Sequence, residues 1–147
     1  MSYFPKQAVL VPFDFSDLSV EAVNVALSTA VSPAHVHVLH VLPEMEVNEP
    51  GMVWGRVDDQ SRKRHAEDAI RKRLSGSQYE GIQIAVVIGD PGHEIADYAD
   101  HHKIDLIVVP SHGRTGWRRV LIGSVAERVV RLANCPVLVL RQPEPKK

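Results

Sequence analysis

Five short apolar segments are spaced along the chain, each rich in Val, Ile and Leu. Apolar segments this short are typical of strands rather than of helices. Most of them are nearly continuous in apolar residues instead of alternating with polar ones. That pattern predicts strands that are covered on both faces, as in parallel sheets. The predicted strands are residues 9–13, 36–42, 82–88, 104–109 and 137–140.

The four segments between these strands carry apolar residues at helical spacing. Ser16 or Asp17 is expected to cap the first helix, and Ser124 the last, because each side chain can accept a hydrogen bond from a free backbone N–H. Pro91 suits the first turn of the third helix. The apolar helical positions are Val20, Val23, Leu27 and Ala30, then Ala66, Ala69, Ile70 and Leu74, then Ile95, Ala96 and Ala99, and last Val125, Val129, Leu132 and Ala133.

Strands and helices alternate strictly, which predicts an α/β fold with a mostly parallel sheet. The 147 residues have the length of one ordinary domain, and the sequence shows no internal repeat. We therefore expect a single domain over residues 1–147, with its core at about 7–141 and a loose, Pro-rich tail at 142–147. Two connections, 43–58 and 110–122, are longer than usual, and long loops in such sheets are often functional.

Composition narrows the class of protein. Lys and Arg number 17 and Asp and Glu 18, a net charge of −1, whereas dedicated nucleic-acid binders usually show a basic excess. The only cysteine, Cys135, cannot form an internal disulfide, which fits a reducing compartment. Neither a signal peptide nor an apolar run near the roughly 18 residues of a membrane helix is present. We expect a cytoplasmic protein with no nucleic-acid or membrane partner.

The connection 110–122 contains the parts of a phosphate site. It leaves the fourth strand at the edge of the sheet where ligands bind in open α/β folds. Its glycines allow a ligand to approach the backbone, and it ends at a helix start, where free N–H groups and the helix dipole favour an anion. Ser124 could add its hydroxyl, and arginines such as Arg114 add positive charge. A surface loop followed by a capping serine fits the same residues about equally well.

Asp14 directly follows the first predicted strand, where a carboxylate could accept hydrogen bonds from a ribose or a base amine. Taken alone, it is more often a neighbour of a helix cap, given Ser16 and Asp17 beside it. The glycine motifs of dinucleotide-binding folds, P-loop NTPases and serine hydrolases are absent. The eight histidines lack the spacing of a catalytic metal site. No catalytic residue and no protein metal ligand are therefore expected.

Several segments together resemble the universal stress protein family over about residues 7–141. ATP-binding members of that family carry the pattern G-x2-G-x9-G-[ST]. Gly113, nine further residues and Gly123-Ser124 match its last two elements, and Pro110 stands in place of its first glycine. The segments that carry the resemblance are 11–16 (VPFDFS), 39–41 (LHV), 108–113 (VVPSHG), 123–127 (GSVAE) and 134–139 (NCPVLV).

The resemblance implies an adenine nucleotide alpha hydrolase-like fold, with a five-stranded parallel sheet of order 3-2-1-4-5 and helices on both faces. A crevice would open between strands 1 and 4, where the strand order reverses. Asp14 and the backbone of Val41 would hold adenine, and the strand-4 end would approach the ribose. The motif glycines and the start of the last helix would cradle the phosphates. The implied nucleotide-binding residues are Pro12, Phe13, Asp14, Val41, Val109, Pro110, His112, Gly113, Arg114, Gly123, Ser124, Val125 and Ala126.

Pro110 is the one departure from the family pattern that bears on the nucleotide. Proline keeps its carbonyl but lacks the N–H, and its φ is fixed at about −65°. If the family glycine adopts a positive φ, Pro110 cannot copy it. If the ribose contact uses only the carbonyl, little is lost.

The family resemblance implies binding and regulation in a stress response rather than catalysis. ATP, or ADP or AMP, would be bound, with Mg²⁺ or Mn²⁺ held through the phosphates. Two alternatives remain open: a nucleotide-free dimeric interaction module of the same fold, and a slow ATP hydrolase. Val137–Leu140 would be an apolar strand at the sheet edge, which invites pairing with another chain. We therefore expect a homodimer through this strand, as is common in the family.

Overall fold

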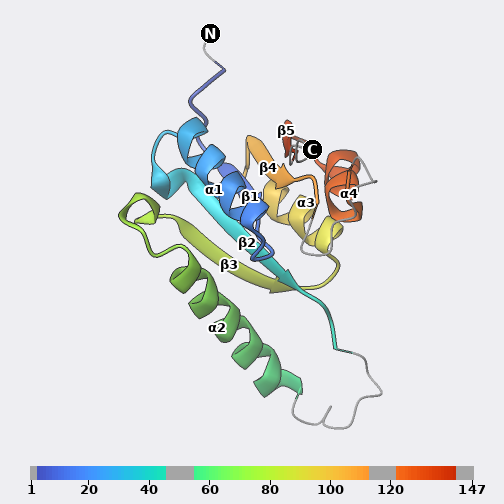
Figure 1. Ribbon diagram of the computed structural model, residues 1–147. Coiled ribbons are helices and arrows are strands. Elements are labelled where there is room, and N and C mark those ends of the chain that lie inside the picture. The colour runs from blue at the N-terminus through green and yellow to red at the C-terminus, as the bar shows by residue number, and fades with distance from the viewer. Residues whose placement is uncertain (1–2, 46–54, 113–121, 142–147) are drawn as a thin grey trace, which may run out of the picture.

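The computed structural model describes residues 3–45, 55–112 and 122–141, with the backbone alone at 55–57 (Figure 1). Its five strands form one parallel sheet in the order β3-β2-β1-β4-β5. The alternating order of elements and the strand order 3-2-1-4-5 are thus confirmed. The strands are β1 (Val9–Pro12), β2 (Val36–Leu42), β3 (Gln83–Ile88), β4 (Leu106–Pro110) and β5 (Val137–Leu140). The helices are α1 (Asp17–Thr29), α2 (Gly55–Arg73), α3 (Pro91–His101) and α4 (Ser124–Leu132), with 3₁₀ turns η1 (Pro33–His35) and η3 (Ser77–Tyr79).

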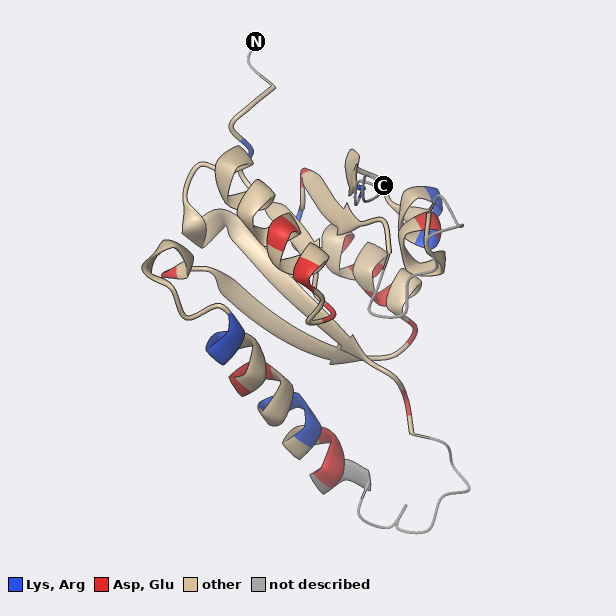
Figure 2. Ribbon diagram, viewed as in Figure 1, with Lys and Arg blue, Asp and Glu red and all other residues tan. Residues whose placement is uncertain are grey.

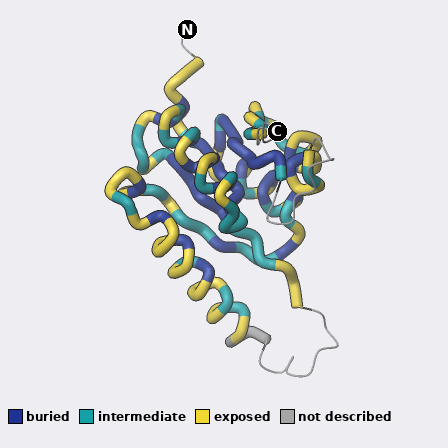
Figure 3. The backbone as a smooth tube through the Cα atoms, viewed as in Figure 1, coloured by how far each residue is buried: buried dark blue, intermediate teal, exposed yellow. Residues whose placement is uncertain are grey.

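Helices cover both faces of the sheet, as the continuous apolar strands predicted. Ala22 and Val23 of α1 pack with Ile70 of α2 against one face. Ile95 of α3 and Val129 of α4 pack against the other. Every residue of β1 and β4 is buried, so the two central strands lie inside two apolar layers (Figure 3).

Charged side chains lie on the outer faces of the helices. Figure 2 shows Lys and Arg interleaved with Asp and Glu along α2. Arg73 at the end of this helix pairs with Asp17 of α1 at 2.6 Å, and Arg62 lies 3.6 Å from Asp59. None of the helices in the described ranges is both long enough and apolar enough to cross a membrane.

Several local predictions from the sequence differ from the structure. The first strand ends at Pro12 rather than at 13, the third begins at Gln83 rather than at 82, and the fourth ends at Pro110 rather than at 109. Helix α2 begins at Gly55, inside the connection predicted over 43–58. The fourth strand begins at Leu106 rather than at 104, because the Ile104 N–H bonds to the Ala99 carbonyl and closes the end of α3. Ser124 does not cap α4: it is the first helical residue, and Gly123 is the N-cap. The predicted cap at Ser16 and the first-turn position of Pro91 are confirmed.

Candidate functional site

The sheet has one point at which the direction of strand order reverses. From β1 the chain passes through α1 to β2 on one side, whereas from β4 it passes through α4 to β5 on the other. The connections that leave β1 and β4 therefore diverge, and a crevice opens at the carboxyl ends of these adjacent strands. The fold alone thus places a ligand-sized space next to Asp14 and Pro110.

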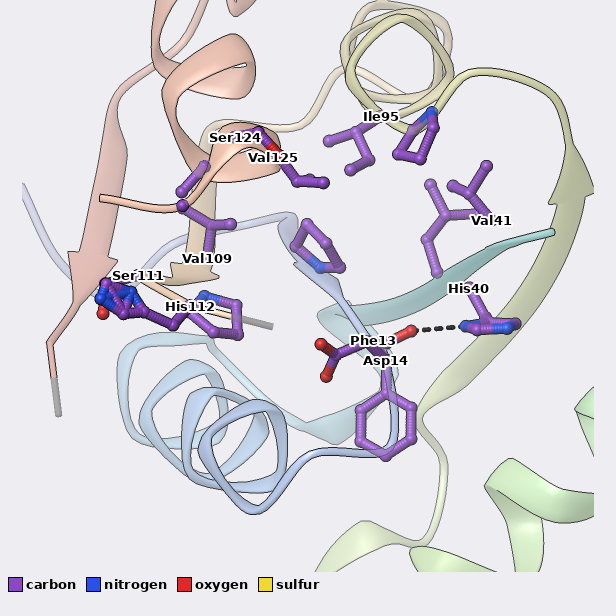
Figure 4. Close-up of a pocket in the computed structure, with 16 residues that line it drawn as sticks. Phe13, Asp14, His40, Val41, Ile95, Val109, Ser111, His112, Ser124 and Val125 are labelled. Carbon is purple, nitrogen blue, oxygen red and sulfur yellow. Dashed lines mark hydrogen bonds between the residues drawn. The ribbon is translucent and has the colours of Figure 1, made fainter. Parts of the chain in front are cut away.

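A cavity of about 500 Å³ occupies this crevice. Figure 4 shows Ile95 and Val125 on one side of the space and Asp14 and His112 across from them. Every residue implied by the family pattern that lies within the described ranges lines this cavity, whereas Gly113 and Arg114 lie outside the described residues. The lining residues are Pro12, Phe13, Asp14, Leu39, His40, Val41, Pro91, Ile95, Val109, Pro110, Ser111, His112, Gly123, Ser124, Val125 and Ala126.

Asp14 combines the two roles that the sequence left open. Its Oδ1 accepts hydrogen bonds from the Ser16 N–H at 3.0 Å and from the Ser16 hydroxyl at 2.5 Å. Ser16 in turn caps α1 by accepting from the Ser19 N–H. Oδ2 of Asp14 has no partner among the described residues, so one carboxylate oxygen supports the helix start and the other is available at the cavity.

The first turn of α4 presents unused backbone donors on the far side of the cavity. Its N-cap, Gly123, has no side chain to cap the helix, and the first helical bond runs from the Glu127 N–H to the Gly123 carbonyl. The N–H groups of Ser124, Val125 and Ala126 consequently have no acceptor within the described part of the chain. Together with the positive end of the helix dipole, such groups favour an anion.

Gly123 is required for close backbone approach rather than for an unusual φ. Its φ is −70°, which any residue can adopt. Its N–H donates to the Ser111 carbonyl at 2.5 Å, and a Cβ at this position would lie 2.9 Å from the same oxygen. Gly123 therefore anchors the start of α4 to the end of β4, and its own N–H is already used.

Pro110 is the last residue of β4, in extended backbone. The neighbouring Ser111 N–H bonds to Leu140 of β5. Because successive backbone groups alternate between the two sides of a strand, the Pro110 carbonyl faces away from β5, toward the crevice. The register between β1 and β4 covers only Leu106 and Ile107, so the absent N–H of Pro110 costs no bond in the sheet. The sequence left open whether this position needs a positive φ or only a contact through its carbonyl. The orientation of the Pro110 carbonyl fits the second alternative.

Asp90 holds the α3 wall of the cavity against α4. This N-cap residue accepts from the His93 N–H at 3.1 Å and the His93 ring at 2.7 Å, and also from Arg128 of α4 at 2.7 Å. The hydrogen bonds from His93 and the charge of Arg128 lower the pKa of Asp90 to about 2. The ionised carboxylate thus links the two helices whose first turns supply Pro91 and Val125 to the cavity.

Sequence reasoning missed five lining residues. Ser111 and Leu39 directly adjoin implied site residues, so strand direction could have indicated them. Pro91 and Ile95 belong to the first turns of α3, which starts at the same sheet edge because it follows the parallel strand β3. His40 was quoted only as part of a family segment. Val125 was expected both as an apolar position of the last helix and, from the family resemblance, as a nucleotide-binding residue; it is 37% exposed and lines the cavity.

One buried polar atom of the site has no partner within the described ranges. The Nδ1 atom of His112 is buried and makes no hydrogen bond there. No group of three or more His, Cys, Asp or Glu side chains in the described ranges is arranged to hold a metal ion.

Comparisons with known proteins identify the family and support the fold. Residues 6–141 match the family model described as "Universal stress protein family". The chain is 34% identical over 142 residues to universal stress protein MJ0531 of Methanocaldococcus jannaschii, covering 92% of this chain and 82% of that protein. It is similar in structure to universal stress protein UspA from Lactobacillus plantarum, with a TM-score of 0.72, 32% identity and coverage of 92% and 99%. A universal stress protein crystallised in complex with cAMP gives a TM-score of 0.58, 25% identity and coverage of 92% and 97%.

Proposed function

This chain belongs to the universal stress protein family, and from that premise we propose that it binds an adenine nucleotide, ATP in particular, in the cavity between β1 and β4. The observation that carries the proposal concerns the backbone N–H groups in the first turn of α4. Three backbone donors, at Ser124, Val125 and Ala126, lack acceptors within the described residues and border a cavity whose opposite wall carries Asp14.

The two ends of the cavity suit the two ends of a nucleotide. The N–H groups of α4 would bind phosphate oxygens, and the Ser124 hydroxyl would add a further donor. Oδ2 of Asp14 and the backbone of Val41 would receive adenine, while the Pro110 carbonyl would approach the ribose. A volume of about 500 Å³ lies within the usual range for small-molecule sites. The related protein that was crystallised with cAMP supports an adenine nucleotide as the class of ligand.

The proposed role is binding and regulation in a stress response. A hydrolase needs a positioned base or nucleophile. Among the described lining residues, Asp14 is bonded to Ser16 and His112 Nδ1 has no hydrogen-bond partner, and neither is paired with a group that would activate it. Mg²⁺ or Mn²⁺ would enter with the phosphates. A turnover assay with ATP and Mg²⁺ distinguishes this role from slow hydrolysis, since release of phosphate above the background rate would assign an activity to the site.

Calorimetry tests the proposal directly. Titration of the folded protein with ATP, ADP, AMP and cAMP at millimolar concentration, with and without Mg²⁺, should give a saturable signal. Mass spectrometry of the purified, denatured protein should also detect co-purified nucleotide. A flat titration with all four ligands would contradict the proposal. It would favour a nucleotide-free interaction module and would direct attention to Pro110.

We further propose that the protein forms a homodimer through β5. This strand is an edge of the sheet, and Leu138 on it is 41% exposed. An apolar strand with one unpaired side is a template for another strand. Light scattering at micromolar concentration should therefore give twice the chain mass of 16.3 kDa. A monomer under these conditions would contradict the proposal.

A further inference from the structure

Phe15 has an unusual backbone conformation at the edge of the cavity. Its φ is 68°, in the left-handed region that bulky side chains rarely adopt. A non-glycine residue in this region is unfavourable and persists only where the surroundings impose it. Phe15 lies between Asp14, which lines the cavity, and Ser16, which caps α1. The outlier therefore marks the turn that orients Asp14.

Two aromatic contacts hold Phe15 in place. Its ring meets the Phe13 ring edge-on, with centroids 5.1 Å apart, and the His40 ring in the same manner at 5.0 Å. Edge-to-face ring contacts of this kind are favourable. Phe15 also packs against the core on the α1 side of the sheet. These contacts offset the cost of the left-handed backbone.

His40 fixes the peptide on the other side of Asp14. Its Nδ1 lies 2.6 Å from the carbonyl oxygen of Phe13, drawn as the dashed line in Figure 4. Since a carbonyl only accepts, Nδ1 carries the proton and donates. The Phe13 N–H bonds in turn to the Leu39 carbonyl at 2.8 Å. Both backbone polar groups of Phe13 are thereby tied to β2, and the Phe13 carbonyl is the one that belongs to the peptide before Asp14.

Asp14 is consequently held by three independent constraints. His40 fixes the peptide before it, the left-handed turn at Phe15 fixes the peptide after it, and Ser16 holds Oδ1. Oδ2 is the remaining atom, and Figure 4 shows the carboxylate pointing away from His40. We infer that His40 and Phe15 are positioning residues that aim Oδ2 of Asp14 at the exocyclic amine of the bound base, and so set a preference for adenine over a 6-oxo purine. This inference rests on the proposed nucleotide site.

The sharpest test compares ATP with inosine 5′-triphosphate, which has a 6-oxo group in place of the amine. Calorimetry on the unmodified protein should show ATP binding about tenfold or more tightly, the range expected for a hydrogen bond to a charged acceptor. Asp14→Asn should bring the ratio of the two affinities toward one. His40→Leu, which removes the donor to Phe13, should lower ATP affinity about tenfold and change inosine triphosphate affinity by less than about twofold.

The chain offers a matched control for His40. His35 lies at the opposite end of β2 and makes the same type of bond, from Nδ1 to the Gln7 carbonyl at 2.6 Å. His35→Leu therefore removes an equivalent link far from the cavity and should leave the affinity ratio unchanged. His40→Asn keeps an N–H donor at the branch where His has Nδ1, and should restore most of the ratio. Phe15→Leu, which loses both ring contacts, should reduce the ratio as His40→Leu does.

The outcomes separate the inference from the proposed function. Binding of ATP and inosine triphosphate with equal affinity by the unmodified protein would overturn the inference alone. So would equal losses for both ligands in His40→Leu, or no loss in a folded variant, as judged by circular dichroism. If His40→Leu does not fold, Phe15→Leu and His40→Asn decide the question by the same ratio. Failure of the unmodified protein to bind either ligand would overturn the proposed function and the inference with it.

Discussion

At the scale of single residues, Gly123 connects the fold to the candidate site. It lets the start of α4 approach the end of β4 so closely that its N–H reaches the Ser111 carbonyl at 2.5 Å. The same approach leaves no room for a side chain, because a Cβ would lie 2.9 Å from that oxygen. A substitution here moves the helix start, and with it the three free N–H groups.

We predict that Gly123→Val abolishes ATP binding at millimolar concentration while the fold is largely kept. The branched side chain would displace the first turn of α4 from Ser111 and occupy space next to the phosphates. Calorimetry measures the binding, and circular dichroism the fold. Gly76→Val is a suitable control, because a Cβ at Gly76 meets only the flexible side chain of Gln78 and lies outside the cavity. Undiminished affinity in Gly123→Val would refute this account of the site.

Ser124→Ala should be milder than Gly123→Val, since it removes one hydroxyl and leaves the backbone donors. A hydrogen bond to a charged group is worth roughly 1.5–3 kcal/mol, or about 10- to 150-fold in affinity. Arg114→Ala should cost least if the Arg114 guanidinium is solvated, because exposed ion pairs contribute at most about 1 kcal/mol. The three affinities, measured by calorimetry, should fall in that order. If Arg114→Ala were the most damaging, side-chain charge rather than the helix start would hold the phosphates.

How far the site could be predicted differs from residue to residue. Asp14 and Ser124 could be predicted as site residues, because Asp14 follows a strand and Ser124 begins a helix whose directions the hydrophobic pattern fixes. That the Gly123 N–H is already bonded could not be predicted, since it depends on a tertiary bond to Ser111. The role of His40 depends in the same way on a contact between two strands that are distant in sequence.

At the scale of elements, β5 is one of the two edge strands of the sheet, the other being β3. Within the described residues β5 pairs only with β4, and Leu138 on it is 41% exposed. Elements of this kind could be predicted well from sequence, and the bounds of β2 and β5 agree with the prediction. The start of α2 could not, because residues 55–58 carry no apolar stripe that would reveal the helix.

We predict that Leu138→Lys converts the proposed homodimer to a monomer. A lysine at an exposed edge carries a charge that a second strand would have to desolvate, which is how natural edge strands avoid pairing. The mass by light scattering should fall to that of one chain, with the thermal unfolding of the monomer little changed. Val31→Lys is a matched control: Val31 is equally accessible, at 47%, but follows α1 rather than β5. A dimer that persists in Leu138→Lys would show that another surface holds it.

At the scale of the whole molecule, the two ends of the parallel strands have different chemistry. The cavity lies at the carboxyl ends, whereas an aromatic and histidine cluster at the amino ends ties α3 to β2. His37 of β2 shares a hydrogen bond of 2.8 Å with the Tyr98 hydroxyl, and His102 stacks on Tyr98 with ring centroids 3.8 Å apart. His37 is only 7% exposed, although it is ionisable. Global stability should therefore depend on pH through a group remote from the ligand.

Burial lowers the pKa of His37 below its ordinary value of 6.5, and the nearby His102 and His35 lower it further. Between the folded and unfolded pKa values the unfolded chain binds more protons, so acid favours unfolding. We predict that the contribution of His37 to the free energy of unfolding does not change with pH above 6.5. It falls as the pH is lowered from 6.5 toward the pKa of His37 in the folded protein. Urea unfolding at pH 5.5 and 7.5 measures this difference. His37→Gln should reduce it, whereas His65→Gln on the exposed face of α2 should not. An equal pH dependence in His37→Gln and the unmodified protein would show that the loss at low pH arises from other groups.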